Sequence, residues 1–539
     1  MSEIGSEELE RLRFRRQFIL GSEVLPRFPS WQRVRVGGKL WLHAHPDLTV
    51  TQAVAGPLEL TLVGFLLDPE NPSDTNAHVL RGLSTRIRVV EDVFRATAGM
   101  GGRWVLIVSI GQKAILFADP CGLRQVCYTI STDRRMWCAS EPTVLAEQLG
   151  LSSSPQAERF LASPYVRSEE EHWWPGDSTL FSEISHLLPN HFLDLTTKTS
   201  HRFWPWAPLQ QVSMAEGVQR GAELLSGLLK SAANRFPLAL PITAGLDSRM
   251  LLAALREVKD EIFYYTLRKH HTPSEDIEVP ARLLRRLGLT HHVIDAMAPA
   301  DEAFWQLYRA NTYGAHKAWS NIAFSLHNHY PSTRVAINGN CAEITRCAYS
   351  RPNRIRRVAA GKVPVRDLLY LGAMDRNAFS LEHIGRWFEE AAPQAIDNGY
   401  DLLDLFYWEQ RMGRWQASAQ LEWDIAQETL SPFNCRALIN TWLGVDRTFR
   451  VPPSSTLFLE MTHRLWPEVL SEPVNPKSSA RKLLRSAKRQ TFSLLGRTPL
   501  LTAYRRIRDI GHRGAGSRAI RGLYALACSR VAHDVLTSV

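Results

Sequence analysis

Residues 238–255, LALPITAGLDSRMLLAAL, hold the pattern that decides the fold of this chain. An apolar run of strand length leads into TAGLDS (243–248), and apolar residues then recur at helical spacing from Met250. Such a strand-to-helix turn predicts an anion site, because backbone N–H groups and the positive end of the helix dipole face the same point. Asp247 would repel a bare phosphate there, so the pattern favours a polyphosphate that carries Mg²⁺. A buried strand before an N-capped helix is the plain alternative.

The segment resembles the pyrophosphate loop of ATP pyrophosphatases, whose usual form is Ser-Gly-Gly-x-Asp-Ser. It is not a Walker loop, because no Gly-Lys-Ser/Thr follows. One departure is an alanine in place of a glycine, and another is the arginine after the serine. The resemblance implies that ATP phosphates bind along the backbone of Thr243, Ala244, Gly245, Leu246, Asp247 and Ser248.

Length and composition set the class of protein. The 539 residues exceed one typical domain, and 45% hydrophobic with 22% charged residues is typical of a globular chain in water. The sequence contains no uninterrupted apolar run of about 18 residues, so it predicts no membrane span. The charged N-terminus MSEIGSEELERLRFRRQF lacks the apolar core of a signal peptide, so we expect a cytoplasmic protein. Seven scattered cysteines without a Cys-x-x-Cys pair favour reduced, buried thiols over a zinc site.

The net charge of +10 is concentrated near the C-terminus. Between Lys477 and Arg530 the chain is rich in lysine and arginine, and Asp509 is the only acid. Such a segment could bind nucleic acid, an anionic membrane or an acidic partner. The alternative is a solvated helical face that packs on the protein through its Leu, Ile and Tyr residues.

The texture of the chain changes near residue 212. Residues 1–20 have the pattern of a polar lead-in with some helical character, and short strands with turns follow from about 33 to 145. Further predictions are a helix over 141–150 that ends at Gly150, a closing hairpin over 179–204 and a linker over 204–211. Beyond residue 212, alternating helices and strands favour a doubly wound parallel sheet. The predicted elements are helix 214–235, strand 238–242, helix 248–257, strand 261–266, helix 275–287, strand 291–294 and a mainly helical stretch over 365–445.

Several separate segments resemble the asparagine synthetase family, over roughly residues 30–480. FADPCGLRQVCY (117–128) is similar to that family's Asp-Pro-x-Gly-x-Arg region, and WCASE (137–141) to its Ala-Ser-Glu segment. Leu188-Pro189-Asn190-His191 lies near the usual Pro-Gly-His of the closing hairpin. In the second half, the stretch from Ser274-Glu275-Asp276 to His291-His292 and residues 411–440 are similar to the segments that follow and close the ATP site.

The resemblance implies a two-domain α/β and α+β fold. Residues 1–207 would form an αββα sandwich of the N-terminal-nucleophile hydrolase type, similar to a glutamine amidotransferase domain. Residues 208–476 would form a doubly wound parallel-sheet domain of the ATP-pyrophosphatase type that binds ATP. Residues 477–539 would be a basic helical extension.

The N-terminal domain lacks the cysteine that the family uses to split glutamine. Residue 2 is Ser2, about 30 residues before the first strand expected near residue 33. A hydroxyl can act as such a nucleophile beside its own α-amine, but Ser2 is too far from the predicted sandwich for that role. The domain is therefore expected to be inactive, as in β-lactam synthetases and lasso-peptide cyclases, which join an amine other than glutamine-derived ammonia.

A second loop departs from the family pattern Ser-Gly-x-Gly-x-Asp-Glu. Here the sequence is Asn338-Gly339-Asn340-Cys341-Ala342-Glu343, and Glu343 falls where the family has its metal-binding Asp. Its carboxylate suits Mg²⁺, although a surface Glu in a turn is the alternative. Gly339 and Asn340 would line the ATP site. Asn340 cannot act as a general base, which argues against simple β-lactam closure.

Other candidates come from the resemblance or from their position beside the loops. Lys477 is the candidate for the family's late lysine, which steadies the adenylate, and a plain surface lysine is the alternative. Tyr265 and Thr266 end a strand where the family cradles adenine. Arg249 and Arg346 could bind pyrophosphate or a substrate carboxylate, or could be surface or ion-pair arginines. Adjacent histidine pairs favour loop and strand-end residues over a metal site: His270, His271, His291 and His292.

Together these features predict an ATP-dependent ligase with Mg²⁺ held by Asp247 and Glu343. A carboxylate, small or peptidic, would attack the α-phosphorus of ATP to give an acyl-adenylate and pyrophosphate. An amine would then attack the acyl carbon and release AMP, in the biosynthesis of a specialised metabolite or modified peptide. Two alternatives stay open: a catalytically drifted nucleotide-binding scaffold, and an enzyme that modifies a carrier or nucleic-acid substrate guided by the basic tail.

Overall fold

The computed structural model describes residues 6–130, 135–168, 172–349 and 364–476. The chain divides into two compact units, Met1–Val474 and Asn475–Val539. The predicted boundary at residue 207 lies inside the first unit, so the three-domain division stays a prediction. The fold below is that of the first unit.

The N-terminal half contains two six-stranded antiparallel sheets. The first sheet has the order β10 (Ser185–His186), β8 (Cys127–Ile130), β9 (Met136–Ala139), β1 (Phe18–Gly21), β3 (Leu40–Ala44), β2 (Gln32–Val36). The second has the order β12 (Thr199–Arg202), β11 (His191–Asp194), β7 (Lys113–Ala118), β6 (Gly101–Ile110), β5 (Leu58–Leu67), β4 (Val50–Ala55). The predicted closing hairpin is present as β11 and β12.

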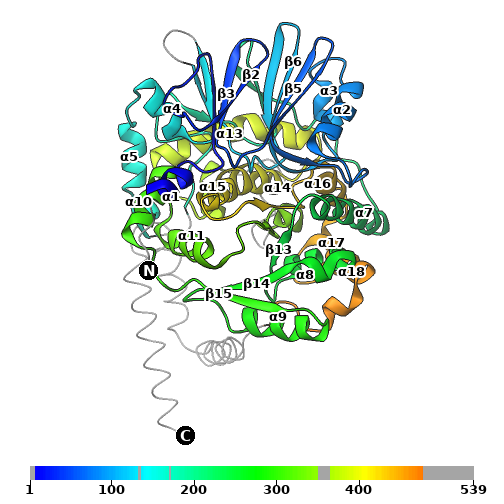
Figure 1. The fold of residues 1–539 in the computed structure, drawn as a ribbon. Helices are drawn as coiled ribbons and strands as arrows, with labels where there is room; N and C mark the ends of the chain where they lie inside the picture. The colour runs from blue at the N-terminus through cyan, green and yellow to red at the C-terminus, as the bar shows by residue number, and fades with distance from the viewer. Residues whose placement is uncertain (1–5, 131–134, 169–171, 350–363, 477–539) are drawn as a thin grey trace, which may run out of the picture. The chain divides into compact units, whose positions relative to one another are not determined.

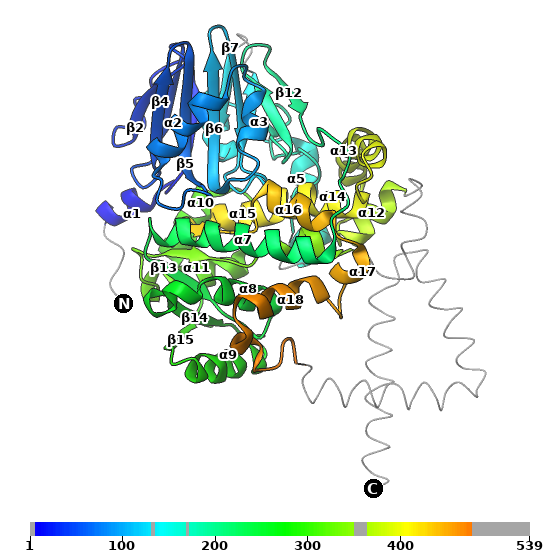
Figure 2. The same cartoon turned by 90° about the vertical axis from the view of Figure 1, so that its right-hand side faces the viewer.

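Three apolar clusters show that these sheets form the middle of four layers. One cluster joins β1 and β9 to α4 (Pro142–Leu149) and α5 (Pro155–Leu161). A second fills the space between the sheets. A third joins β5 and β6 to α2 (Asn76–Arg86) and α3 (Asp92–Ala96), which lie outside the second sheet in Figure 2. The layers therefore run helix, sheet, sheet, helix. As predicted, α4 ends at Gly150, which has a left-handed φ of 63°.

The sequence prediction was wrong about where the first strand begins. A short helix, α1 (Ser6–Leu12), is followed by β1, which is fully buried between β3 and β9. The strand was missed because arginines surround it in the sequence. Arg15 and Arg16 are nevertheless buried, since they pair with Asp47 and Glu428. The number of residues between Ser2, which lies outside the described residues, and the first strand is therefore about half of that expected.

The C-terminal half contains a five-stranded sheet in which every pairing is parallel. Its order is β15 (His291–Asp295), β14 (Phe263–Arg268), β13 (Leu238–Pro241), β16 (Val335–Ile337), β17 (Thr429–Leu430). The predicted alternation is confirmed, but β17 lies in the stretch expected to be mainly helical. That strand has only two residues, too few for a sequence pattern.

Alternating side chains of β13 show that helices cover both faces of this sheet. Leu238 and Leu240 pack with the first group of helices, and Ala239 packs with the second. The first group is α7 (Met214–Ala233), α8 (Leu246–Ala254), α9 (Glu275–Arg286) and α18 (Thr456–Leu465). The second is α10 (Glu302–Asn311), α11 (Lys317–His329) and α15 (Ala417–Trp423). The sheet is therefore doubly wound, as predicted.

Further helices lie between the antiparallel sheets and the parallel sheet (Figures 1 and 2). They include α14 (Leu402–Phe406), the π-helical Tyr407–Gln416 and α16 (Arg436–Leu443). The others of this half are α12 (Val365–Leu371), α13 (Ala378–Asp397) and α17 (Arg447–Arg450). A buried ionic cluster joins the halves: Arg103 donates to both carboxylate oxygens of Asp424, at 2.6 and 2.7 Å. Because this buried contact joins residues of both halves, the two halves share one interior.

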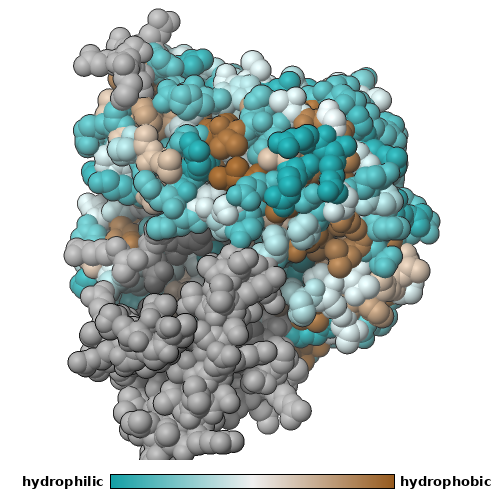
Figure 3. All heavy atoms as spheres, turned by 90° about the horizontal axis from the view of Figure 1, so that it is seen from below, coloured by the Kyte–Doolittle hydropathy of each residue, from teal (hydrophilic) through white to brown (hydrophobic). Residues whose placement is uncertain are grey.

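The surface seen from below is mostly hydrophilic outside the residues of uncertain placement, and hydrophobic residues form separate patches (Figure 3). No helix among the described residues is long and apolar enough to cross a membrane. Six of the seven cysteines lie in the described ranges, and all six are buried free thiols.

Candidate functional site

The topology of the parallel sheet brings two loops together. The chain runs from β13 through α8 to β14 and β15, and later returns to β16 on the other side of β13. The turns after β13 and β16 therefore leave the same edge of the sheet, at the point where the winding reverses. Doubly wound sheets bind ligands at such points, outside the carboxyl ends of the strands. Residues 243–248 follow β13 here, and residues 338–343 follow β16.

The loop after β13 already uses part of its backbone. The N–H of Thr243 donates to the Ser248 hydroxyl at 3.3 Å, and that of Ala244 to Asp276 at 3.1 Å. The N–H of Gly245 donates to the Thr243 hydroxyl. The first N–H groups of α8, from Leu246 onward, lack partners within the helix by geometry. They are the groups that an anion could reach without displacing a side chain, a smaller set than the sequence predicted.

Two carboxylates from the two loops share one guanidinium. The Nη2 atom of Arg346 donates to Oδ2 of Asp247 at 2.7 Å and lies 3.5 Å from Oε1 of Glu343. The other oxygens, Oδ1 of Asp247 and Oε2 of Glu343, are buried and have no hydrogen-bond partner among the described residues. The structure thus brings the two predicted metal ligands to a common cation. Unpartnered carboxylate oxygens of this kind fit Mg²⁺, which prefers oxygen ligands.

Burial explains the electrostatics of this cluster. It raises the pKa of Asp247 to about 7, with the Glu343 charge adding to the rise and Arg346 opposing it. Burial also lowers the pKa of Arg346, but the two carboxylates outweigh that and raise it above its usual value. The site therefore has a deficit of positive charge, which a divalent cation would correct.

Gly339 permits the close approach of the two loops. A Cβ atom at this position would lie 2.7 Å from Cβ of Asp247. The next turn has Cys341 in a left-handed conformation with φ 77°, which starts the short helix Ala342–Arg346 and aims Glu343 and Arg346 toward α8. Asn340 is half-buried, and its carbonyl accepts from the Ser431 hydroxyl.

A cavity of about 460 Å³ lies beside the loop after β13. Thr243 and Thr266 line it, with Lys269, His270 and His271. Its volume and position suit the nucleoside part of a nucleotide. The side chain of Tyr265 does not line this cavity: it points into the core, and its hydroxyl lies 3.5 Å from Gln427, so the predicted contact of adenine with the backbone of this strand end stays a prediction. Strand alternation explains this, since neighbours on β14 face opposite sides of the sheet.

Arg249 does not face either loop, so the suggested role in binding pyrophosphate or a carboxylate is wrong. Its side chain is fully buried and donates to the carbonyls of Val469, Glu472 and Pro473. This position therefore faces the segment after α18 and not the loop. Lys477 lies outside the described residues, so its role stays a prediction.

Sequence reasoning missed the two side chains that complete the site. Arg346 was considered as a ligand of pyrophosphate or of a substrate carboxylate, not as a bridge between the two acids, and Asp276 only as part of a family segment. The spacing of Glu343 and Arg346, three residues apart, could have indicated a pair on one helical turn. The contact of Asp276 with Ala244 crosses between separate elements and left no local signal.

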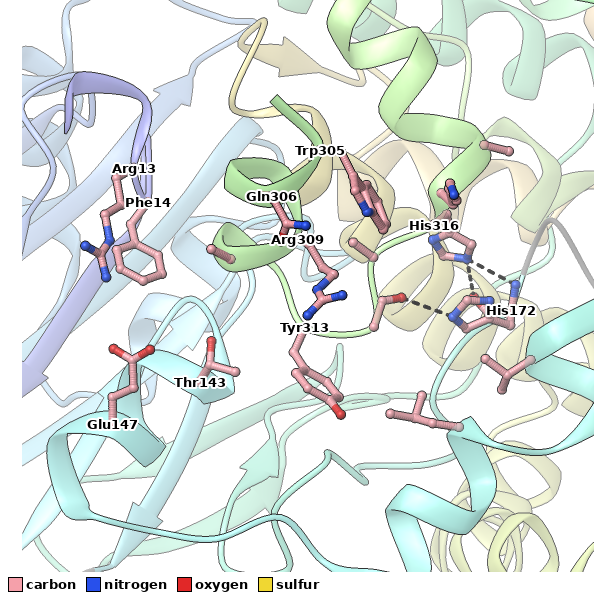
Figure 4. Close-up of a pocket in the computed structure, with 17 residues that line it drawn as sticks. Arg13, Phe14, Thr143, Glu147, His172, Trp305, Gln306, Arg309, Tyr313 and His316 are labelled. Atoms are coloured by element: carbon pink, nitrogen blue, oxygen red, sulfur yellow. Dashed lines mark hydrogen bonds between the residues drawn. The ribbon is translucent and has the colours of Figure 1, made fainter. Parts of the chain in front are cut away.

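A second, larger cavity of about 810 Å³ lies near the start of α11. Figure 4 shows Arg309 of α10 and Tyr313 reaching toward its middle, with His172 and His316 on one side. His316 is buried and bonds Glu422 at 2.7 Å. Among the described residues that line this cavity, none belongs to the predicted ATP site.

Comparisons with known proteins do not assign a family. No protein-family model matches the sequence, and no curated protein matches it. Among solved structures, an allosteric regulatory enzyme of purine biosynthesis aligns at 11% identity and TM-score 0.22, over 57% of this chain and 75% of its own. Glutamine phosphoribosylpyrophosphate amidotransferase from B. subtilis, complexed with ADP and GMP, aligns at 11% identity and TM-score 0.21, over 73% and 93%.

Glutamine-dependent NAD+ synthetase from Acinetobacter baumannii, in complex with ADP, aligns at 16% identity and TM-score 0.17, over 45% of this chain and 62% of that one. Scores this low do not establish a common fold.

Proposed function

We propose that this chain is an ATP-dependent ligase that adenylates a carboxylate and transfers the acyl group to an amine. The observation that carries the proposal is the pair Asp247 and Glu343. They meet at the switch point of a doubly wound sheet, and each has a buried carboxylate oxygen that has no partner among the described residues. Structural ion pairs rarely leave such oxygens unused, because each unpaired polar atom costs free energy.

The chain supplies positions and charges for this reaction. Asp247 and Glu343 would hold Mg²⁺, which when bound neutralises phosphate charge. The N–H groups that open α8 would bind the β- and γ-phosphates, and the cavity lined by Thr243 and Thr266 would hold the nucleoside. A substrate carboxylate then attacks the α-phosphorus in line with the departing pyrophosphate. Lys477 is the proposed cation for the adenylate.

The second half of the reaction limits the choice of substrate. Asn340 cannot accept a proton, so the attacking amine must lose its proton to another group or to water. The acid and the amine are proposed to come from a specialised metabolite or a modified peptide, as implied by the resemblance to β-lactam synthetases and lasso-peptide cyclases.

Pyrophosphate release tests the proposal. The protein with Mg²⁺ and ATP is screened against carboxylic acids and amines, and pyrophosphate and AMP are quantified. The Asp247→Asn and Glu343→Gln variants should each lose at least about 100-fold in rate, because metal-bound charge stabilises the reacting phosphates. Asp295→Asn is the matched control, since Asp295 is a half-exposed carboxylate that pairs with Arg268 at the surface. Equal rates in all four proteins would refute the proposal.

A nucleotide-binding scaffold is the second candidate, and Arg346 favours it. A guanidinium that already bridges the two carboxylates could replace the metal permanently. ATP binding that neither needs Mg²⁺ nor leads to pyrophosphate with any substrate would support the scaffold over the ligase.

A further inference from the structure

Arg346 occupies the position between the two carboxylates that a metal ion would need. It is mostly buried, with 15% of its side chain exposed, and it contacts both Asp247 and Glu343 through the same nitrogen, Nη2. Glu343 and Arg346 stand on one short helix, so they approach Asp247 together. The guanidinium therefore neutralises part of the charge of both acids.

A divalent cation and this guanidinium compete for the same two carboxylates. Two positive charges a few ångströms apart in a partly buried site repel each other. The unpartnered oxygens Oδ1 of Asp247 and Oε2 of Glu343 give a metal two contacts, but the remaining contacts are those that Arg346 holds. Coordination through both oxygens of either carboxylate would therefore displace Arg346 from it.

We infer that Arg346 is a resident counter-ion of this site, an inference that rests on the proposed function. It holds Asp247 and Glu343 together before metal binds, yields their oxygens to the divalent cation, and then donates to the phosphate oxygens that arrive with it. The planar fork of an arginine suits phosphate as well as carboxylate. Its Nε atom is buried and has no partner among the described residues, so a donor is ready for a new acceptor.

Loss of the Arg346 guanidinium should have opposite effects on the binding of two ligands. Removal of the guanidinium should strengthen the binding of metal alone, because a competitor is lost. It should weaken the binding of magnesium pyrophosphate, because a phosphate donor is lost. A residue with a merely structural role would weaken both or neither.

Mn²⁺ is the probe for the first measurement, with bound and free ion separated by electron paramagnetic resonance in the absence of nucleotide. Arg346→Gln should bind Mn²⁺ at least about tenfold more tightly than the unmodified chain. Arg346→Lys keeps the charge and should stay within about threefold of it. Arg447→Gln is the matched control, because Arg447 forms a comparable pair with Asp401 at 2.9 Å outside the site. Circular dichroism and thermal unfolding verify the fold of each variant.

The second measurement is calorimetric titration with magnesium pyrophosphate, in which Arg346→Gln should lose at least about tenfold in affinity. Mn²⁺ affinity that is unchanged in Arg346→Gln but lost in Asp247→Asn would overturn the role of Arg346 and leave the metal site of the proposed ligase intact. Absence of Mn²⁺ binding from every variant would overturn both. Weaker binding of both ligands by Arg346→Gln would show a structural residue and would also overturn the inference.

Discussion

Two buried charge clusters of this molecule differ in their ratio of arginines to carboxylates. At the junction of the two halves, Arg16, Arg103 and Arg124 surround Asp424 and Glu428, and each of the four carboxylate oxygens meets a guanidinium within 3.1 Å. At the switch point, within the part of the chain that the structure describes, Asp247 and Glu343 share one arginine, Arg346, and one oxygen of each has no partner. The junction therefore has three arginines for two carboxylates, whereas the switch point has one arginine for two carboxylates.

This difference distinguishes a cluster that holds the structure together from one that can bind a ligand. A buried carboxylate whose oxygens all accept hydrogen bonds has no capacity left for a ligand, and it fixes the elements that it connects. A buried carboxylate with an unused oxygen can still bind a ligand, but the unsatisfied oxygen lowers the stability of the fold. Four experiments on stability and metal binding would break or sharpen this contrast.

Asp424→Ala should have the largest effect on stability. It leaves Arg103 buried without its bidentate partner, and removal of one member of a buried pair costs roughly 3–5 kcal/mol. Denaturant unfolding at pH 7 measures the change in the free energy of unfolding. As a control, Asp295→Asn at the half-exposed pair with Arg268 should change the free energy of unfolding far less, because surface ion pairs contribute little to stability. Comparable losses in the two variants would contradict the view of the junction as a tightly matched joint.

Asp404 is an intermediate case, with one acid and one arginine. Arg450 donates to it at 3.2 Å, yet burial dominates and raises the pKa of Asp404 to about 7. Between its unfolded pKa near 4 and about 7, the folded protein holds a proton that the unfolded chain has released. Stability should therefore fall as the pH rises through this window, by at most about 1.4 kcal/mol per pH unit. Urea unfolding from pH 4 to 8 should show a flatter profile for Asp404→Asn, and an identical profile would refute the assignment.

Gly339→Ala tests whether the two loops must touch. The new methyl group would lie 2.7 Å from Cβ of Asp247, so the loops must separate, at about 1–3 kcal/mol of stability. Mn²⁺ binding should weaken in parallel, because the two carboxylates move apart. Gly385→Ala on α13 is the control: its methyl group meets no atom of the described residues within 4 Å and should stabilise the helix by roughly 0.5–1 kcal/mol. Intact metal binding in Gly339→Ala would separate the loop contact from the site.

Asp247→Asn should have the smallest effect on stability, in contrast to Asp424→Ala. Burial disfavours the charged form of Asp247, and the amide keeps the shape of the side chain, so the free energy of unfolding should change by less than about 1 kcal/mol. Thermal unfolding with calorimetry measures it. A loss as large as that of Asp424→Ala would mean that both clusters are structural and would remove the distinction between them.

The fold was largely predictable where one element carries its own pattern. The run 238–255 predicted β13 and α8, and alternation of apolar segments predicted the parallel sheet, because each strand and helix buries a face that its own residues define. The strand β1 was missed because Arg15 and Arg16 looked exposed in the sequence. Their partners Asp47 and Glu428 lie far along the chain.

For the site, the sequence by itself determined the chemistry: two acids in two loops, a glycine beside one of them and an amide, Asn340, that cannot accept a proton. Only the tertiary structure decided that Arg346 stands between Asp247 and Glu343, that Arg249 turns away and that Tyr265 enters the core. These outcomes depend on how helices and strands from distant parts of the chain pack together. Spacing in the sequence shows which residues share a face of one helix or strand, whereas the contacts of Arg346 with both acids depend on the distance between two such elements.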